Sequence, residues 1–209
     1  MSGKCIRKIE RNTCNDFESI GVECQYNNEY QIFNLFDKYV RANNNIGNAA
    51  MWDLGILHSS NDIIVLMDND VFVEKDWDKE MIDKLSDNSI GVTFPYSVLG
   101  TDDYRATQYR GRKDGFCFAF RKETYNKVGP FLQNQPFHSY YEDDNFFMEV
   151  MKLGLKLVAC ESSRVFHKGQ GTTKQMMNIE IKDGIEANKK WFEEKWEKEY
   201  PCLTTQKVL

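Results

Sequence analysis

Residues 63–70 read Ile-Ile-Val-Leu-Met-Asp-Asn-Asp, a short apolar run followed by two acids that are separated by one asparagine. The run is short and rich in β-branched side chains, which predicts a central strand buried on both faces in a parallel sheet. Ligands of open α/β sheets bind beyond the carboxyl ends of the strands. Asp68 and Asp70 are therefore placed to hold one hard cation, which in turn can hold a diphosphate.

The same acids allow a second interpretation. Asp-Asn-Asp is common in turns, because these side chains accept hydrogen bonds from nearby backbone amides. An EF-hand is excluded, since that loop needs an oxygen ligand and then glycine at the positions where this chain has Phe72 and Val73. The choice between a turn and a metal site depends on the other motifs of the chain.

Length and composition fit one globular α/β core. The chain has 209 residues, of which 41% are hydrophobic, and a net charge of −5 that gives no general surface for nucleic acid. No apolar stretch approaches the roughly 20 residues of a membrane span. Six well-separated cysteines without a C-x-x-C pair predict free thiols, so we expect a cytoplasmic protein.

Alternating apolar runs and amphipathic segments predict an α/β fold with a sheet flanked by helices. We expect one domain over residues 1–209, made of a first half at about 1–100 and a second half at about 101–209 that ends in a C-terminal helix. Strands are predicted at residues 18–24, 63–67, 90–94, 116–120 and 156–160. Helices are predicted at residues 30–39, 49–58, 77–85, 144–153 and 178–200.

A second acidic cluster, Glu142-Asp143-Asp144, stands where a loop enters a predicted helix. Acids are favourable in the first turn of any helix, so N-capping alone could explain them. A carboxylate facing a metal-diphosphate site could instead take the proton from an attacking hydroxyl, which is general-base catalysis.

A histidine, His167, ends an apolar run and precedes a glycine-rich stretch. Single histidines are usually structural or solvated. This one could instead complete the ligand set of a cation, and a mixed carboxylate and imidazole set suits Mn²⁺.

Taken in order, these motifs resemble those of family 2 glycosyltransferases with the GT-A fold, over roughly residues 18–197. The matching features are Asn45-Ile46-Gly47 with Gly55, Asp68 and Asp70, Gly115, Arg121, Val128-Gly129-Pro130-Phe131, Glu142-Asp143 with Gly154, His167, and Lys195-Trp196.

The resemblance implies a metal-dependent, inverting transferase that uses a nucleotide-diphosphate sugar, most often a uridine one. By position, Asp143 is the expected base, with Glu142 beside it. The expected ligands of Mn²⁺ or Mg²⁺ are Asp70, Asp68 and His167. The residues expected to contact the nucleotide sugar are Glu23, Asn45, Gly47, Asp68, Asn69 and Asp70.

The chain also departs from the family pattern. Only about 17 residues precede the strand predicted at 18–24, so the usual first strand is expected to be absent. Trp52-Asp53 stands where the family usually has an arginine. Asn145 replaces a common aspartate, and Glu149 replaces a common arginine.

Three other classes of protein remain open. A glycoside hydrolase also uses paired carboxylates but needs no cation. A sugar nucleotidyltransferase shares the fold class, although its glycine-rich basic loop is not seen near the N-terminus. A GT-A-like module that binds a donor without catalysis is the third. The acceptor could be a glycan, a lipid-linked sugar, a protein or a modified base.

Overall fold

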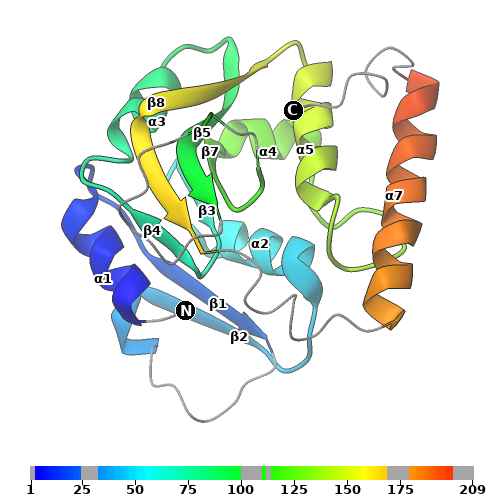
Figure 1. The fold of residues 1–209 in the computed structure, drawn as a ribbon, viewed down its shortest axis with the longest axis horizontal. Helices are drawn as coiled ribbons and strands as arrows, with labels where there is room; N and C mark the ends of the chain where they lie inside the picture. Colours follow the sequence, from blue (N-terminus) through cyan, green and yellow to red (C-terminus); the bar gives the residue numbers. More distant parts are fainter. Residues whose placement is uncertain (1–2, 25–32, 100–109, 112–113, 169–178, 200–209) are drawn as a thin grey trace.

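The computed structural model describes residues 3–24, 33–99, 110–111, 114–168 and 179–199 (Figure 1). The helical elements are α1 (Gly3–Asn12), the 3₁₀ turn η1 (Phe33–Leu35), α2 (Gly47–His58), α3 (Lys79–Lys84), α4 (Lys122–Val128), α5 (Glu142–Lys152) and α7 (Ile179–Glu199). The strands are β1 (Ile20–Cys24), β2 (Lys38–Ala42), β3 (Ile63–Met67), β4 (Val71–Val73), β5 (Ile90–Leu99), β6 (Arg110–Gly111), β7 (Cys117–Arg121) and β8 (Lys156–His167).

The described strands form two sheets. A six-stranded mixed sheet has the order β3-β7-β5-β8-β4, with β6 paired to β5, and a separate two-stranded parallel sheet contains β1 and β2. Within the larger sheet β5 and β8 are parallel, whereas the other pairs are antiparallel. The predicted α/β fold with a mixed sheet and flanking helices is confirmed. In the described part of the chain no strand precedes β1, as expected.

Strand β3 has the predicted bounds, but its predicted central position in a parallel sheet is wrong. It pairs antiparallel with β7 and is the last strand in the order of the described sheet. Only alternate side chains are buried, Ile64 and Leu66, while Val65 between them is 36% exposed. A continuous apolar run does not specify how many neighbours a strand has, because the neighbours come from distant parts of the chain.

The predicted helix over residues 30–39 is also wrong. Residues 33–35 form only the turn η1, and β2 begins at Lys38; residues 30–32 lie outside the described part. In the parallel register Tyr39 stands opposite Gly21. A Cβ atom at Gly21 would lie 2.7 Å from the Tyr39 ring, so the glycine lets this ring pack directly on the β1 backbone. The strand pairing therefore overrides the local helical pattern.

The core occupies both faces of the larger sheet, and β7 shows why. Its side chains alternate, so that Phe118 and Phe120 enter a cluster with α2, α4 and α5, whereas Cys117 and Ala119 enter a cluster with α3. The ring of Phe146 in α5 stacks on Phe131 with centroids 4.4 Å apart. The first cluster thus anchors α5, the helix that carries the acids.

Two strands run further than predicted. Strand β5 continues to Leu99, and β8 continues to His167. Their register shifts once, because Pro95 pairs with Cys160 whereas the next residue, Tyr96, pairs with Arg164. The intervening Glu-Ser-Ser resembles the end of a strand in the sequence, but it forms a bulge. Beyond the bulge, β8 reaches β4, and His167 pairs with Val71.

Two further observations concern membrane spans and cysteines. No helix among the described residues is long and apolar enough to cross a membrane. The five cysteines in the described residues, Cys5, Cys14, Cys24, Cys117 and Cys160, are free thiols.

Candidate functional site

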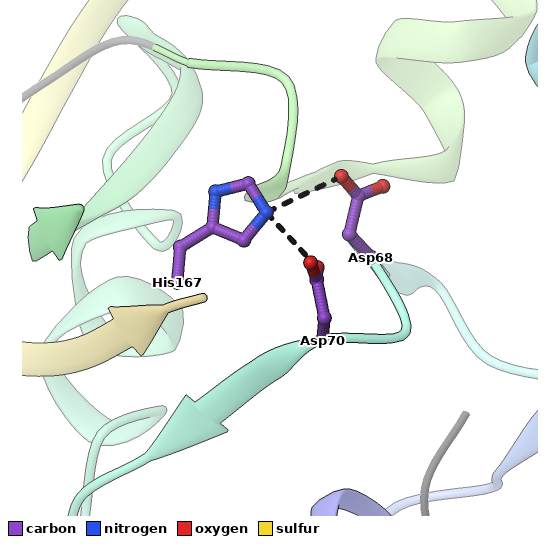
Figure 2. Close-up of side chains that lie close together, drawn as sticks. All are labelled: Asp68, Asp70 and His167. Carbon is purple, nitrogen blue, oxygen red and sulfur yellow. Dashed lines mark ion pairs between the residues drawn. The ribbon is translucent and has the colours of Figure 1, made fainter. Parts of the chain in front are cut away.

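The β3–β4 turn and the end of β8 bring Asp68, Asp70 and His167 together. The Asp68 amide donates to the carbonyl of Phe116 at 2.8 Å, and the Val71 amide donates back to the carbonyl of Asp68 at 3.4 Å. The Asp-Asn-Asp segment is therefore a turn, and this turn presents two carboxylates. Figure 2 shows both carboxylates directed at the imidazole, whose Nε2 lies 3.0 Å from Asp70 Oδ1 and 3.8 Å from Asp68 Oδ2.

The chemistry of this group fits a divalent cation. One ligand atom from each of the three side chains lies within 4.8 Å of the others, and two carboxylates with an imidazole suit Mn²⁺ or Mg²⁺. Burial in the site raises the pKa of Asp68, His167 opposes this rise, and the charges of Asp70 and Asp143 add to it. A cation between the oxygens would offset this desolvation and repulsion.

Ring stacking orients His167. Its side chain is 13% exposed and lies on Phe116 with ring centroids 4.2 Å apart and an interplanar angle of 25°. Its Nδ1 atom is buried and has no hydrogen-bond partner in the described part of the chain. Histidine ligands are usually oriented by a hydrogen bond from the second nitrogen. Here the Phe116 ring supplies that constraint.

The acids lie in the first turn of α5, which begins at Glu142, two residues before the predicted start. Asp143 is partly buried, and this burial raises its pKa, while backbone amides of Asp144, Asp143 and Gly115 donate hydrogen bonds that favour the ionised form. The fit is close, since a Cβ atom at Gly115 would lie 2.1 Å from Asp143 Oδ2. A carboxylate held in this way can accept a proton.

Glu142 has a different environment from Asp143. It is 3% exposed, and burial followed by the charge of Asp143 raises its pKa to about 8. The side chain of Asn48 contributes a hydrogen bond, but Glu142 Oε2 has no partner among the described residues. Burial raises the pKa of both neighbouring carboxyls, and the charge of Asp143 adds to the rise at Glu142, so ionising both at once is unfavourable.

A pocket of about 380 Å³ connects the two groups, because Asp68 belongs to the metal-ligating group and also lines the pocket together with Glu142 and Asp143. Its walls include the aromatic residues Trp52 and Phe116. The pocket is thus lined both by one carboxylate of the group that could hold a cation and by the acids of α5.

The other residues predicted to contact a nucleotide sugar, Glu23, Asn45, Gly47, Asn69 and Asp70, are not among the residues that line this pocket. Asn45 accepts a hydrogen bond from the Gly47 amide at 3.1 Å at the start of α2. Asn69 is exposed at the tip of the β3–β4 turn. Glu23 lies in the two-stranded sheet, where it accepts a hydrogen bond from the Tyr39 hydroxyl at 2.8 Å, and it does not line the pocket.

Six pocket residues are not among the site residues or matching motifs of the sequence analysis: Asn48, Trp52, Phe116, Tyr140, Tyr141 and Ile185. The Tyr-Tyr pair directly before Glu142 is a signal that could have been used, since aromatic residues next to acids are typical of sugar sites. Nothing local marks Ile185, because α7 brings it to the pocket from the end of the chain.

The departures at residues 53, 145 and 149 have structural explanations. Asp53 accepts hydrogen bonds from the Tyr125 hydroxyl and from the amides of Phe131 and Leu132. Lys195 Nζ donates to Asn145 Oδ1 and Glu149 Oε1, both at 2.8 Å. A lysine of α7 thus bridges the two residues that depart from the family pattern in α5.

Comparison with known sequences and structures gives consistent results. Residues 25–149 match the family described as glycosyl transferase family 2. No match was found among curated proteins.

Several solved structures have a similar fold. GalNAc-T7 with UDP, GalNAc and Mn²⁺ has a TM-score of 0.63 and 17% identity, over 78% of this chain and 40% of that one. The Pyrobaculum calidifontis mannosyltransferase PcManGT with GDP-Man and Mn²⁺ has a TM-score of 0.62 and 12% identity, over 80% and 53%. TarS of S. aureus has a TM-score of 0.61 and 11% identity, over 79% and 34%. The chain thus spans about half or less of these proteins, and the predicted GT-A fold is confirmed.

Proposed function

The chain belongs to glycosyl transferase family 2, and on that basis we propose that it transfers a sugar from a nucleotide-diphosphate donor, preferentially a UDP-sugar, to an acceptor hydroxyl. One observation carries this proposal. The carboxylate of Asp68 is shared between the group that can hold a cation and the pocket that contains Asp143. A donor diphosphate and an acceptor hydroxyl can therefore meet in one cavity.

In this proposal Asp70, Asp68 and His167 hold Mn²⁺ or Mg²⁺, as their spacing allows. When bound, the cation supplies positive charge next to the leaving diphosphate. Asp68 and Asp70 would hold the cation through carboxylate oxygens and His167 through a ring nitrogen, with the ring kept in place by Phe116. The solved structures that contain Mn²⁺ with UDP or GDP-Man support this part of the proposal.

The acid pair performs the proton transfer. Asp143 accepts the proton of the acceptor hydroxyl on a carboxylate oxygen as that hydroxyl attacks the sugar carbon. The amides that donate to Asp143 keep its carboxylate oriented. Glu142, which retains its own proton, leaves only one negative charge in the pair. Attack opposite the leaving diphosphate inverts the anomeric centre.

We further propose a division of labour along a single domain. Residues 1 to about 100 bind the nucleotide sugar, with Asn45, Gly47 and Asn69 near the donor and Glu23 toward the nucleoside. Residues from about 101 to 209 bind the acceptor and supply the base. The acceptor is a hydroxyl of a glycan, a lipid-linked sugar, a protein or a modified base.

The proposal is tested by calorimetric titration of UDP with Mn²⁺ and with a chelator. We expect binding only with Mn²⁺, and Asp70→Ala should reduce UDP affinity by at least about 100-fold, because one of two charged ligands is lost. Asp83→Ala, at an exposed site in α3, is the matched control and should bind UDP normally. Equal affinity in the chelator would contradict the cation site.

A panel of UDP-sugars with Mn²⁺ then separates the classes of protein. Donor turnover that stops in the chelator supports the transferase. Turnover of a glycoside that persists in the chelator indicates a hydrolase. Mn²⁺-dependent binding with no turnover of any donor, with or without candidate acceptors, indicates a module that only binds the donor.

A further inference from the structure

The segment that leads into the acids has an unusual backbone. Tyr140 and Tyr141 have φ angles of 72° and 67°, in the left-handed region that tyrosine seldom adopts. Such a conformation persists only where the surroundings fix it. The Tyr141 carbonyl accepts the hydrogen bond of the Asn145 amide at 3.0 Å, which closes the first turn of α5. The direction of Glu142 and Asp143 therefore depends on how this segment is held.

Asn188, on α7, holds it through four hydrogen bonds. Its side chain is completely buried, and its Nδ2 donates to the carbonyls of Phe137, Ser139 and Tyr140 at 2.8 to 2.9 Å. Its Oδ1 accepts a hydrogen bond from the Phe137 amide at 2.8 Å. One amide group thus satisfies both ends of the segment, which a purely apolar contact could not do.

Two more contacts of α7 lie on the same helix face. Gly184, Asn188 and Phe192 are spaced four residues apart, so they form one stripe. A Cβ atom at Gly184 would lie 2.5 Å from the Phe137 ring, and the ring of Phe192 lies 5.5 Å from that of Tyr141. Figure 1 shows α7 next to α5 at one side of the molecule. This stripe follows the segment from Phe137 to Tyr141.

The start of α2 encloses the segment from another direction. A Cβ atom at Gly47 would lie 2.0 Å from the His138 carbonyl oxygen, and the Asn48 amide donates to the Ser139 hydroxyl at 3.4 Å. The segment is therefore confined between two helices. Among the described residues, α7 donates side-chain hydrogen bonds to the carbonyls of Phe137, Ser139 and Tyr140, whereas α2 lies in the part of the chain that matches the family.

We infer that Asn188 is a positioning residue for Glu142 and Asp143, which it orients through the backbone of residues 137–141. It does not line the pocket, and its hydrogen bonds go to residues 137, 139 and 140, so its effect is indirect. The catalytic part of this inference rests on the proposed function. The structural part, that Asn188 fixes the left-handed segment, does not depend on it.

Asn188→Asp is the most direct test. The substitution keeps the size and one acceptor oxygen, but it replaces the donating nitrogen with an oxygen that faces three carbonyls. We expect amide hydrogen exchange in peptides covering residues 137–146 to become at least about 10-fold faster. Turnover of the UDP-sugar that the wild type hydrolyses fastest should fall by about 10- to 100-fold, because small displacements of reacting groups are costly. UDP affinity with Mn²⁺ should change less than about threefold, since the cation ligands lie elsewhere.

Two control variants separate positioning from general loss of stability. Asn126→Asp makes the same chemical change at an exposed site in α4 and should behave as wild type. Ala187→Gly weakens α7 by about the helix propensity of one residue but leaves Asn188 in place. It should lower the melting temperature without the loss of turnover per bound donor. Asn188→Ala repeats the test without added charge if the aspartate variant does not fold.

Wild-type rates of amide hydrogen exchange in both Asn188 variants would show that Asn188 does not fix residues 137–141. Faster exchange with unchanged turnover would show that it fixes the segment but does not position the acids. If the wild type turns over no donor, the proposed function fails. The exchange rates would still show whether Asn188 fixes the segment, so the two failures are distinguishable.

Discussion

The metal-ligating group and the acid pair face one pocket, but they are held in different ways. Asp68, Asp70 and His167 stand at the ends of strands whose pairing fixes their backbone, as in the register of Val71 with His167. Glu142 and Asp143 stand at the end of a loop with two left-handed residues, and side chains from other helices hold that loop. Strand register therefore builds one half of the site, and tertiary packing builds the other.

This difference has a practical meaning. A site built on register tolerates changes in its surroundings, because many backbone hydrogen bonds support it. A site built on packing depends on a few contacts, and a change far from the reacting atoms can displace it. Variants in the two halves should consequently fail differently, the metal half in ligand affinity and the acid half in rate.

The largest effect is expected for Asp143→Asn. Loss of a general base typically reduces the rate by about 10²- to 10⁴-fold. The UDP affinity and the melting temperature should remain near those of the wild type, since asparagine also suits a helix start and Asp143 makes little contact with the donor. Transfer rate, UDP affinity and melting temperature are measured on one preparation.

Asp183→Asn, at an exposed position in α7, is the matched control for this experiment. Wild-type transfer by Asp143→Asn would show that Asp143 only caps the helix. The role of base would then pass to Glu142 or Asp144.

A smaller effect is expected for Phe116→Leu, which removes the ring that stacks on His167. Loss of a group that orients a metal ligand typically weakens metal binding by about 10-fold or more. Calorimetric titration of Mn²⁺ measures this change. Phe17→Leu, at a phenylalanine that is 42% exposed, is the control. Unchanged Mn²⁺ affinity would mean that β8 alone orients His167. The metal-ligating group would then depend even less on side-chain packing than the acid pair does.

The smallest effect is expected in the pH dependence of stability. The folded state raises the pKa of Glu142 from 4.5 to about 8, so between these values it keeps a proton that the unfolded chain has lost. Stability then falls as the pH rises through this interval. Glu142→Gln cannot ionise and should escape this loss. Its melting temperature relative to wild type should therefore be higher at pH 8.5 than at pH 5. The difference should be about 2–4 °C for each kcal/mol of unfolding free energy that the wild type loses between these pH values.

The measurement is a thermal melt in the absence of divalent cations. Glu123→Gln, at an exposed position in α4, should give the same difference from wild type at both pH values. A pH-independent difference for Glu142→Gln would mean that Glu142 is ionised in the folded protein, and that the acid pair carries two charges.

The sequence predicted features that local patterns determine. The bounds of β3 and the C-terminal end of α2 followed from apolar runs with turn residues beside them, and the order of the acidic motifs led to the GT-A fold. The edge position of β3, the strand β2 in place of a helix, and the continuation of β8 to His167 depend on partners far along the chain. Asn188 and Ile185 are unremarkable in the sequence, because their contacts come only from the packing of α7.

The confinement of the segment at residues 137–141 also has a consequence for redesign. The match to the family ends at Glu149, after both acids, whereas α7 follows later and contributes Ile185 to the pocket wall. The side chain at position 185 lines the pocket but is neither a proposed cation ligand nor a proposed base, and it is not part of the stripe of Gly184, Asn188 and Phe192. If the pocket admits the acceptor as proposed, we expect substitutions at this one position to change which acceptors are used while the proposed reacting groups are retained.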